Sequence, residues 1–406
     1  MKMHYAKVIS LCTFIFLFVN MGLTSTSFGV YQPYLVELPY VGNTGGSLIL
    51  STRTFTSMAL MMFADRFYHA LGYRRGVTLA TLCSAVGFVL YALAPSFPVL
   101  IAGAIFAGAG YGLGGMIAVT VLVKRWYASG RGGALGFASV STGIAAMIIP
   151  LVAVQVIANI SLSVSFMVEA ALSFAVAAVV FALLRNRPSD KGLEPLHDPA
   201  AEEAGSTRVH AHKPKPMPDG ARRLFLLAVV CVGGVCMSSN TYLSVYLTTQ
   251  GYDGGFAAGM LSLAAVSLTA SKALTGRLFD RMSSSIASLI MFGCQVSGLI
   301  LLIAAGSITS ILLVVCGALL ASFGLVLGTI GVSEWSLELV PRRNAGKFVK
   351  DCQVAYVVGG LAGNFIPGPI SDVMGSYQDA YGVFLLMAVS AMVIVAVTYK
   401  RYRVPV

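Results

Sequence analysis

Two short stretches, MFADR at residues 62–66 and RLFDR at residues 277–281, decide how this chain is organised. Each stretch ends a long apolar run, and the two Asp-Arg pairs are 215 residues apart, close to half of the 406-residue chain. One Asp-Arg pair at a helix end is a weak signal. The same pair at equivalent places in two halves predicts a duplicated plan of six helices, a linker and six more helices.

The apolar runs around these pairs have the length of membrane spans. The chain is 57% hydrophobic and 11% charged, with a mean hydropathy of +0.82, and successive apolar runs of about 20 residues are typical of transmembrane helices. The first run continues from Val8 to about residue 30 without a small-residue cleavage site, which favours a span over a signal peptide. The predicted helices are 8–32, 46–65, 76–94, 99–123, 133–157, 163–184, 224–249, 256–279, 286–306, 309–333, 347–370 and 381–399.

The predicted fold is all-α, a polytopic membrane protein with twelve transmembrane helices in two pseudo-symmetric six-helix bundles. Residues 1–184 form the predicted N-terminal bundle, residues 185–223 a cytoplasmic linker, and residues 224–406 the C-terminal bundle. Six prolines and mixed charges predict a flexible linker, and its three histidines are interpreted as solvated. The seven cysteines lack metal-ligand spacing and are interpreted as helix-packing residues. We therefore expect no metal and no cofactor.

Basic residues indicate which side of the membrane each loop occupies. Of the 27 lysines and arginines, 25 lie in the N-terminus, the loops after every second span and the C-terminal tail. The opposite loops carry Glu37, Asp253, Asp372 and Asp379 instead. This positive-inside pattern predicts an inner-membrane protein with both termini in the cytoplasm. It also explains the net charge of +11 without a nucleic-acid partner.

The two remaining cations, Arg53 and Lys272, lie inside the second and eighth predicted helices. At 1.5 Å per residue they lie roughly 18 Å and 12 Å from the Asp-Arg ends. A cation facing lipid at such depth costs about 3 kcal/mol or more, so each should face protein or water. Their registers differ by four residues, about 40° from eclipsed, so they share nearly the same face of equivalent helices. We therefore predict that both flank one central cavity and bind an anion.

The two Asp-Arg stretches resemble the loop motif Gly-x-x-x-Asp-Arg-x-Gly-Arg of the major facilitator superfamily. The first copy departs from this motif, because Met61 replaces the leading glycine and an insertion precedes Gly72. The resemblance implies a conformational latch on the cytoplasmic side, although simple helix capping and topology charge explain the same residues. The residues implied in the latch are Asp65, Arg66, Arg75, Asp280 and Arg281.

A closer resemblance is to the monocarboxylate porter and oxalate/formate antiporter branch. It is carried by VKRWYASGRGGALG at 123–136, SFGVY at 27–31 and GPISD at 368–372. Lys272 stands where carboxylate porters of this branch carry a substrate-binding arginine, and lysine offers a point charge instead of a fork. Leu268 replaces the aspartate of proton-coupled porters, and no cation lies in the middle of the eleventh helix. We therefore hypothesise that Arg53 supplies the second charge; the alternative is a structural pair with an acid or a helix carbonyl.

Further candidates are polar and aromatic residues within the spans. Glu169 in the sixth helix is a candidate proton site or arginine partner. The Gly-rich run at 108–115 favours close helix packing over a dinucleotide loop, because no strand precedes it. Cavity candidates, for which helix packing is the alternative, are Phe28, Tyr31, Tyr111, Asn240, Tyr242 and Tyr356.

These patterns predict a secondary active transporter that moves a small organic anion, a mono- or dicarboxylate, by alternating access. Arg53 and Lys272 would bind the anion in a monomer within the lipid bilayer. Exchange against a counter-anion, symport with a proton and uniport all stay open. An efflux carrier for amphipathic compounds, with the two cations as locks between the bundles, is the alternative. A non-transporting sensor on the same fold is a third interpretation. The spans contain no nucleophile–base pair and no metal constellation that would predict an enzyme, so we expect no catalytic residue.

Overall fold

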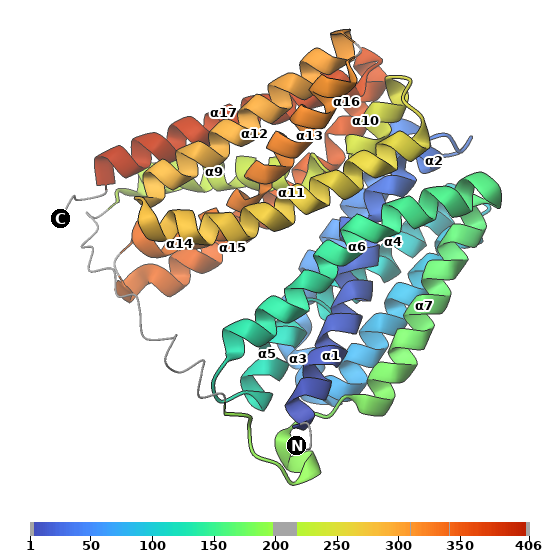
Figure 1. Ribbon diagram of the computed structural model, residues 1–406, viewed down its shortest axis with the longest axis vertical. Coiled ribbons are helices and arrows are strands. Elements are labelled where there is room, and N and C mark those ends of the chain that lie inside the picture. The colour runs from blue at the N-terminus through green and yellow to red at the C-terminus, as the bar shows by residue number, and fades with distance from the viewer. Residues whose placement is uncertain (1–3, 198–216, 309, 341, 403–406) are drawn as a thin grey trace. The chain divides into compact units, whose positions relative to one another are not determined.

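The computed structural model describes residues 4–197, 217–308, 310–340 and 342–402 (Figure 1). Within the helices, the side chains of residues 273, 276, 277, 279–281, 337 and 342–347 fall outside this description. The described residues form helices throughout, and their one β-bridge joins Tyr127 to Leu196. The predicted all-α class is confirmed.

Ten helical segments of the described residues are long and apolar enough to cross a membrane. They cover eleven of the twelve predicted spans, because the predicted helices 46–65 and 76–94 are joined in one 51-residue helix, α3 (Gly42–Ala92). The remaining predicted span, the eleventh at 347–370, corresponds to α15 (Arg342–Phe365) and α16 (Pro367–Met374). Five charged residues in the first ten positions of α15 lower the hydropathy of that helix.

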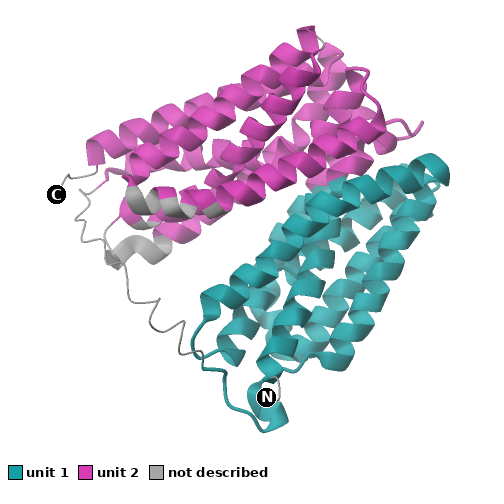
Figure 2. Ribbon diagram, in the orientation of Figure 1, with its two compact units in different colours: residues 1–28, 52–209 teal, residues 29–51, 210–406 magenta. Residues whose placement is uncertain are grey.

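Unit 1 comprises residues 1–28 and 52–209, of which residues 4–28 and 52–197 are described (Figure 2). In unit 1, α1 contacts α5, α6 and α7, and the π-helix η1 contacts α4 and α6. Large apolar side chains of α6 and α7, such as Phe137, Phe174 and Phe181, are exposed, as expected for helices of a membrane protein. Besides the second part of α3, its elements are α1 (Tyr5–Leu17), η1 (Phe18–Thr26), α4 (Phe97–Leu113), α5 (Met116–Trp126), α6 (Arg131–Asn159), α7 (Leu162–Leu183) and η3 (Pro188–Lys191).

Unit 2 comprises residues 29–51 and 210–406, of which residues 29–51 and 217–402 are described with the gaps given above. Within it, α9 packs against α15 and α17, and α12 packs against α13 and α17. Its helices after residue 217 are α9 (Asp219–Ser238), α10 (Leu243–Thr249), α11 (Gly254–Arg281), α12 (Ser284–Ile308), α13 (Ile311–Gly324), η4 (Leu325–Gly328), α14 (Ile330–Glu338), α15, α16 and α17 (Tyr377–Tyr402).

Residues 29–51 belong to unit 2, although the sequence assigns them to the first six-helix bundle. They hold most of the 3₁₀-helix η2 (Phe28–Tyr31), the short helix α2 (Gln32–Val36) and the start of α3. The helix α2 contacts α10. Because α3 is helical across residues 51 and 52, where the two units divide, it begins in unit 2 and ends in unit 1.

Glycines shape α3 and its packing. Gly72 interrupts α3 with φ 73° and ψ 164°, a conformation that side chains with a Cβ rarely adopt, so the helix has two legs. The Gly-rich end of α4 lies directly on the first leg, because a Cβ at Gly108 would come 2.5 Å from the carbonyl oxygen of Arg53. A Cβ at Gly112 would come equally close to the carbonyl oxygen of Ser57. The prediction of close helix packing at residues 108–115 is confirmed.

The beginning of the predicted linker is folded. The N–H of Leu196 donates to the carbonyl oxygen of Trp126 at 2.9 Å, and the N–H of Ala128 donates to that of Leu196 at 2.9 Å. The Trp126 indole also donates to the carbonyl oxygen of Arg185 at 3.2 Å. Residues 185–197 therefore pack against unit 1, unlike the flexible segment expected from composition, because the loop after α5 offers them backbone partners. Residues 198–216 lie outside the described residues.

Candidate substrate-binding site

Arg53 lies in the first leg of α3 and is buried within unit 1, with 4% of its surface exposed. Its Nη1 donates to the carbonyl oxygen of Thr24 at 2.6 Å. Thr24 lies near the end of η1, where helix carbonyls lack intrahelical partners, so the guanidinium satisfies one of them. This is the helix-carbonyl contact that the sequence left open as the structural alternative for Arg53.

Aromatic side chains surround this arginine. The Arg53 guanidinium carbon is 5.2 Å from the centre of the Phe28 ring, within the range of a cation–π interaction. The Phe28 ring is 5.3 Å from the ring of Tyr91 and 6.4 Å from the ring of Phe166. Tyr111 and Tyr91 are near enough to interact electrostatically with Arg53. We call Phe28, Tyr91, Tyr111 and Phe166 the aromatic cluster. Sequence reasoning found Phe28 and Tyr111 but missed the other two.

Glu169 lies on the same face of α7 as Phe166, one turn further along the helix. Both side chains are buried, and 4% of the Glu169 surface is exposed. The structure therefore places the candidate proton site on the helix face that carries part of the aromatic cluster. Its backbone carbonyl accepts a hydrogen bond from the Ser173 hydroxyl at 2.7 Å.

Lys272 lies in α11 of unit 2, and its side chain is exposed. Within the described part of the chain it forms no hydrogen bond and no ion pair. The neighbouring Ser271 is fully buried and donates to the Leu268 carbonyl at 2.8 Å. The helix therefore buries one side at Ser271 and presents the ammonium group on a different side.

The other candidates in unit 2 are held by packing. Asn240 accepts a hydrogen bond from the Ser322 hydroxyl at 2.9 Å, which links the end of α9 to α13. The Tyr242 hydroxyl, fully buried, donates to the carbonyl oxygen of Asn364 at 2.5 Å. Tyr31 is also fully buried, whereas Tyr356 is half-buried. A substrate role for these four residues stays a prediction.

The residues implied in the cytoplasmic latch flank the kink of α3. Asp65, Arg66 and Arg75 are exposed in unit 1. The neighbouring Arg74 has clear partners instead: its Nε donates to the Phe181 carbonyl at 2.7 Å, and its guanidinium lies 4.4 Å from the Phe181 ring. The Asp280 and Arg281 side chains lie outside the described residues. The latch therefore stays a prediction.

A polar group that sequence reasoning missed holds residues 29–51 in unit 2. The Asp372 carboxylate accepts hydrogen bonds from the Asn43 amide and the Thr44 N–H, each at 3.0 Å, and from the Thr44 hydroxyl. The Tyr377 hydroxyl donates to Asn43 Oδ1 at 2.9 Å. We call Asn43, Thr44, Asp372 and Tyr377 the Asp372 cluster. The carboxylate lies at the N-terminus of α3, where the helix dipole favours negative charge.

One turn further along α3, Ser47 continues these contacts. Its hydroxyl is 2.6 Å from the Tyr242 hydroxyl and accepts a hydrogen bond from the Gly368 N–H at 2.8 Å. The same segment also carries a cost, because Gln32 is fully buried and its side-chain amide has no hydrogen-bond partner among the described residues. A buried amide without partners costs about 1–3 kcal/mol. Hydrogen bonds of the Asp372 cluster and Ser47 thus stabilise the placement of residues 29–51, and the unsatisfied Gln32 amide destabilises it.

The described helices are long and apolar enough to define a polytopic helical membrane protein. Residues 10–350 match the family model described as Major Facilitator Superfamily, so the chain belongs to that superfamily. No curated protein sequence matches the chain.

Solved transporter structures share the fold. A variant of the peptide transporter POT in complex with alafosfalin matches with a TM-score of 0.71 and 15% identity, over 97% of this chain and 93% of that chain. A D-xylose-proton symporter matches with a TM-score of 0.69 and 13% identity, over 97% of each chain. A variant of the nucleoside transporter NupG also matches with a TM-score of 0.69 and 13% identity, over 97% of this chain and 99% of that chain. At such low identity these matches establish the fold.

Proposed function

We propose that this protein is a secondary active transporter that moves a small mono- or dicarboxylate across the inner membrane by alternating access. The observation that carries the proposal is the exposed side chain of Lys272 in an apolar helix, without an ion pair in the described part of the chain. A cation at this depth is costly when it faces lipid, so it faces a water-filled path. An anion that enters this path would neutralise the charge.

Arg53 supports the same proposal from unit 1. Its guanidinium is permanently charged and is positioned by the Thr24 carbonyl and the Phe28 ring. One membrane-depth cation therefore belongs to each unit. An anion that binds both cations couples substrate binding to a change between two conformations, as alternating access requires.

Residues 29–51 are the segment suited to such a change. Hydrogen bonds of the Asp372 cluster favour the observed placement, and the buried Gln32 amide opposes it. Substrate that binds one placement of this segment better than another would shift the equilibrium between them.

Glu169 is the proposed proton site if transport is proton-coupled, because it is the buried carboxyl group on α7 beside the aromatic cluster. Exchange against a second anion is the alternative coupling, favoured by Leu268 at the position of the branch aspartate. The charge pattern supports cytoplasmic termini, and the proposed functional unit is the monomer.

The test is uptake into proteoliposomes of radiolabelled formate, oxalate, lactate and succinate, with and without a proton gradient or internal counter-anion. We expect uptake of one of these anions by the wild-type protein and loss of uptake in Lys272→Ala, with partial retention in Lys272→Arg. Lys400→Gln removes an exposed cation at the end of α17 and serves as the matched control. Uptake by Lys272→Ala at the wild-type rate would exclude the proposed site.

The aromatic cluster supports a second function, efflux of amphipathic compounds, because rings around a buried cation also suit apolar substrates. In that case Arg53 and Lys272 act as locks between the units. A thermal-shift screen separates the two functions. Stabilisation by apolar amines and dyes, with no response to carboxylates, would favour efflux.

A further inference from the structure

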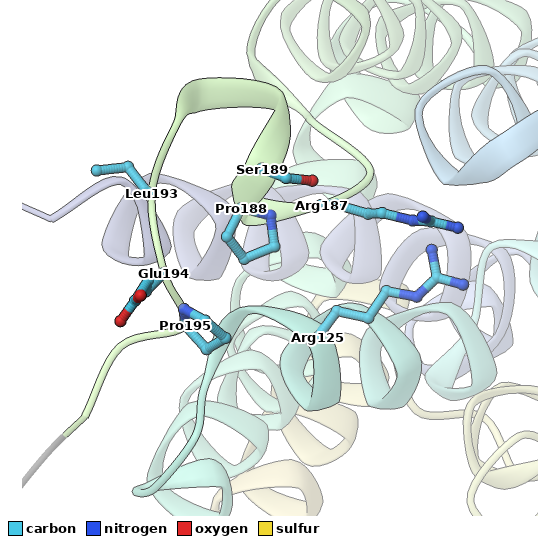
Figure 3. A pocket seen from close by; sticks show the side chains of 7 residues that line it. All are labelled: Arg125, Arg187, Pro188, Ser189, Leu193, Glu194 and Pro195. Atoms are coloured by element: carbon cyan, nitrogen blue, oxygen red, sulfur yellow. The ribbon is translucent and has the colours of Figure 1, made fainter.

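An open surface pocket of about 430 Å³, which we call the cavity, lies at the predicted cytoplasmic end of unit 1 and shares no lining residue with the candidate substrate site. It is lined by the last turn of α5 and by the folded segment after α7, including Arg125, Arg187, Ser189 and Glu194 (Figure 3). Its size is that of a small-ligand site. Neither the transport proposal nor the family motif uses it.

The walls of this cavity are fixed by backbone contacts. Two hydrogen bonds between residues 126–128 and Leu196 join the loop after α5 to the folded segment. The Trp126 indole bonds the Arg185 carbonyl, and Trp126 is fully buried. The cavity is therefore preformed, and a ligand would not have to order its walls.

Two guanidinium groups share the cavity. Figure 3 shows Arg125 and Arg187 pointing toward one another, whereas the carboxylate of Glu194 points away from them. The Arg125 guanidinium lies 4.6 Å from the ring of Tyr73, a stacking contact that positions it. Within the described part of the chain neither arginine forms an ion pair.

The other acid of this segment, Asp190, is already engaged. The Asp190 carboxylate accepts hydrogen bonds from the backbone N–H groups of Asn186 at 3.0 Å and Arg187 at 3.1 Å. It thus stabilises the turn before η3 and leaves the Arg187 guanidinium directed into the cavity. Two like charges that face each other raise the local positive potential, and an anion between them lowers the electrostatic energy.

We propose that this cavity binds a phosphate group, either in the headgroup of an anionic phospholipid or as a free phosphate compound. Two arginine forks match the oxygens of a phosphate group, and the Ser189 hydroxyl adds a donor. The ends of α5 and α7 lie where the charge pattern predicts the cytoplasmic leaflet, whose anionic lipids occupy basic pockets of this kind. Binding would fasten the start of the segment that connects the two units.

The test measures phospholipid binding to the purified, delipidated full-length protein by native mass spectrometry, with phosphatidylglycerol against phosphatidylcholine. Arg187→Gln is the main variant, because Arg187 is exposed and its guanidinium forms no hydrogen bond or ion pair with a described residue. We expect phosphatidylglycerol to bind this variant about tenfold more weakly than the wild type, and Arg125→Gln to reproduce the loss. Lys400→Gln removes one exposed cation from the end of α17 and should bind phosphatidylglycerol as the wild type does.

Competition distinguishes the two phosphate sources. Displacement of phosphatidylglycerol by millimolar inorganic phosphate, but not by acetate at equal ionic strength, would assign the cavity to a free phosphate compound. No displacement by either salt, together with weaker lipid binding in Arg187→Gln, would assign it to the lipid headgroup. Equal lipid binding by the wild type, Arg187→Gln and Arg125→Gln would overturn the proposal. The result is independent of carboxylate uptake, which is measured separately.

Discussion

Arg53 and Lys272 occupy nearly equivalent places in the sequence repeat, yet their surroundings differ. Arg53 is 4% exposed, and it bonds the Thr24 carbonyl and lies over the Phe28 ring. Lys272 is exposed and makes no hydrogen bond or ion pair in the described part of the chain. Although the two cations have equivalent positions in the repeat, contacts within unit 1 hold Arg53 in place, whereas no such contact holds the Lys272 side chain. The difference should separate stability from transport when each is mutated.

The largest effect is expected for Arg53→Met, which should abolish uptake and also destabilise the protein. The buried Thr24 carbonyl would lose its donor, which costs about 2 kcal/mol. Thermal unfolding in detergent and uptake in proteoliposomes measure the two effects on one preparation. Arg53→Lys, which keeps the charge, is the control and should recover more stability than uptake. An unchanged unfolding temperature in Arg53→Met would mean that the hydrogen bond to the Thr24 carbonyl does not contribute to stability.

Lys272→Met should abolish uptake to the same extent but leave stability within about 0.5 kcal/mol of the wild type, as exposed substitutions do. The same two measurements apply, so the pair of methionine variants directly tests the comparison. A loss of stability as large as in Arg53→Met would show that Lys272 has a structural partner.

A smaller effect is expected from the packing of α4 against the helix that carries Arg53. Gly108→Ala should destabilise the protein by about 1–2 kcal/mol, because the new Cβ would meet the carbonyl oxygen of Arg53 at 2.5 Å and displace α4. Gly259→Ala in α11, where a Cβ meets nothing within 4 Å, is the matched control. It should be neutral or stabilising, since alanine is the better helix former. Chemical denaturation of both variants measures the difference, and equal destabilisation would contradict the assigned packing.

The smallest effect concerns pH at the Asp372 cluster. Burial by itself would raise the pKa of the Asp372 carboxyl, but hydrogen bonds from Thr44 and Asn43 outweigh it and hold the pKa below its usual value of 3.8. The folded state therefore gains stability above pH 3.8, and this gain is lost as pH falls through the lowered pKa. The gain is less than about 1 kcal/mol, because the carboxylate is exposed.

Thermal unfolding between pH 3 and pH 6 measures this effect, with Asp372→Asn as the comparison. The variant should be less stable than the wild type at pH 6 and should converge with it toward pH 3. If the stability difference between the wild type and Asp372→Asn were constant across this range, the ionised carboxylate would not contribute to stability.

Much of the fold could be predicted, because hydropathy and charge act locally. The predicted helices correspond to described helices, and the tight packing at residues 108–115 was foreseen from glycine spacing. The interruptions were not foreseen. The π-helix η1 and the break between α9 and α10 depend on contacts with other helices, and apolar runs carry no signal for them.

The candidate site was predicted in part. Arg53 was identified because a cation at that depth is costly, but its partner Thr24 is a backbone carbonyl and leaves no trace in the sequence. Tyr91 and Phe166 look like ordinary core residues until Phe28 is placed against both of them. Asp372 was interpreted as a loop acid, because its partners Asn43 and Thr44 lie more than 300 residues away in the chain.

The sequence by itself determined the class of the protein, the duplicated plan, the positive-inside charge pattern and the two cations within the spans. These follow from composition, spacing and the cost of charge in lipid, which need no knowledge of contacts. The tertiary structure decided that Arg53 is fixed while Lys272 is exposed, that residues 29–51 belong to unit 2, and that residues 185–197 fold against α5. Each of these depends on which distant groups pack together and satisfy each other's hydrogen bonds.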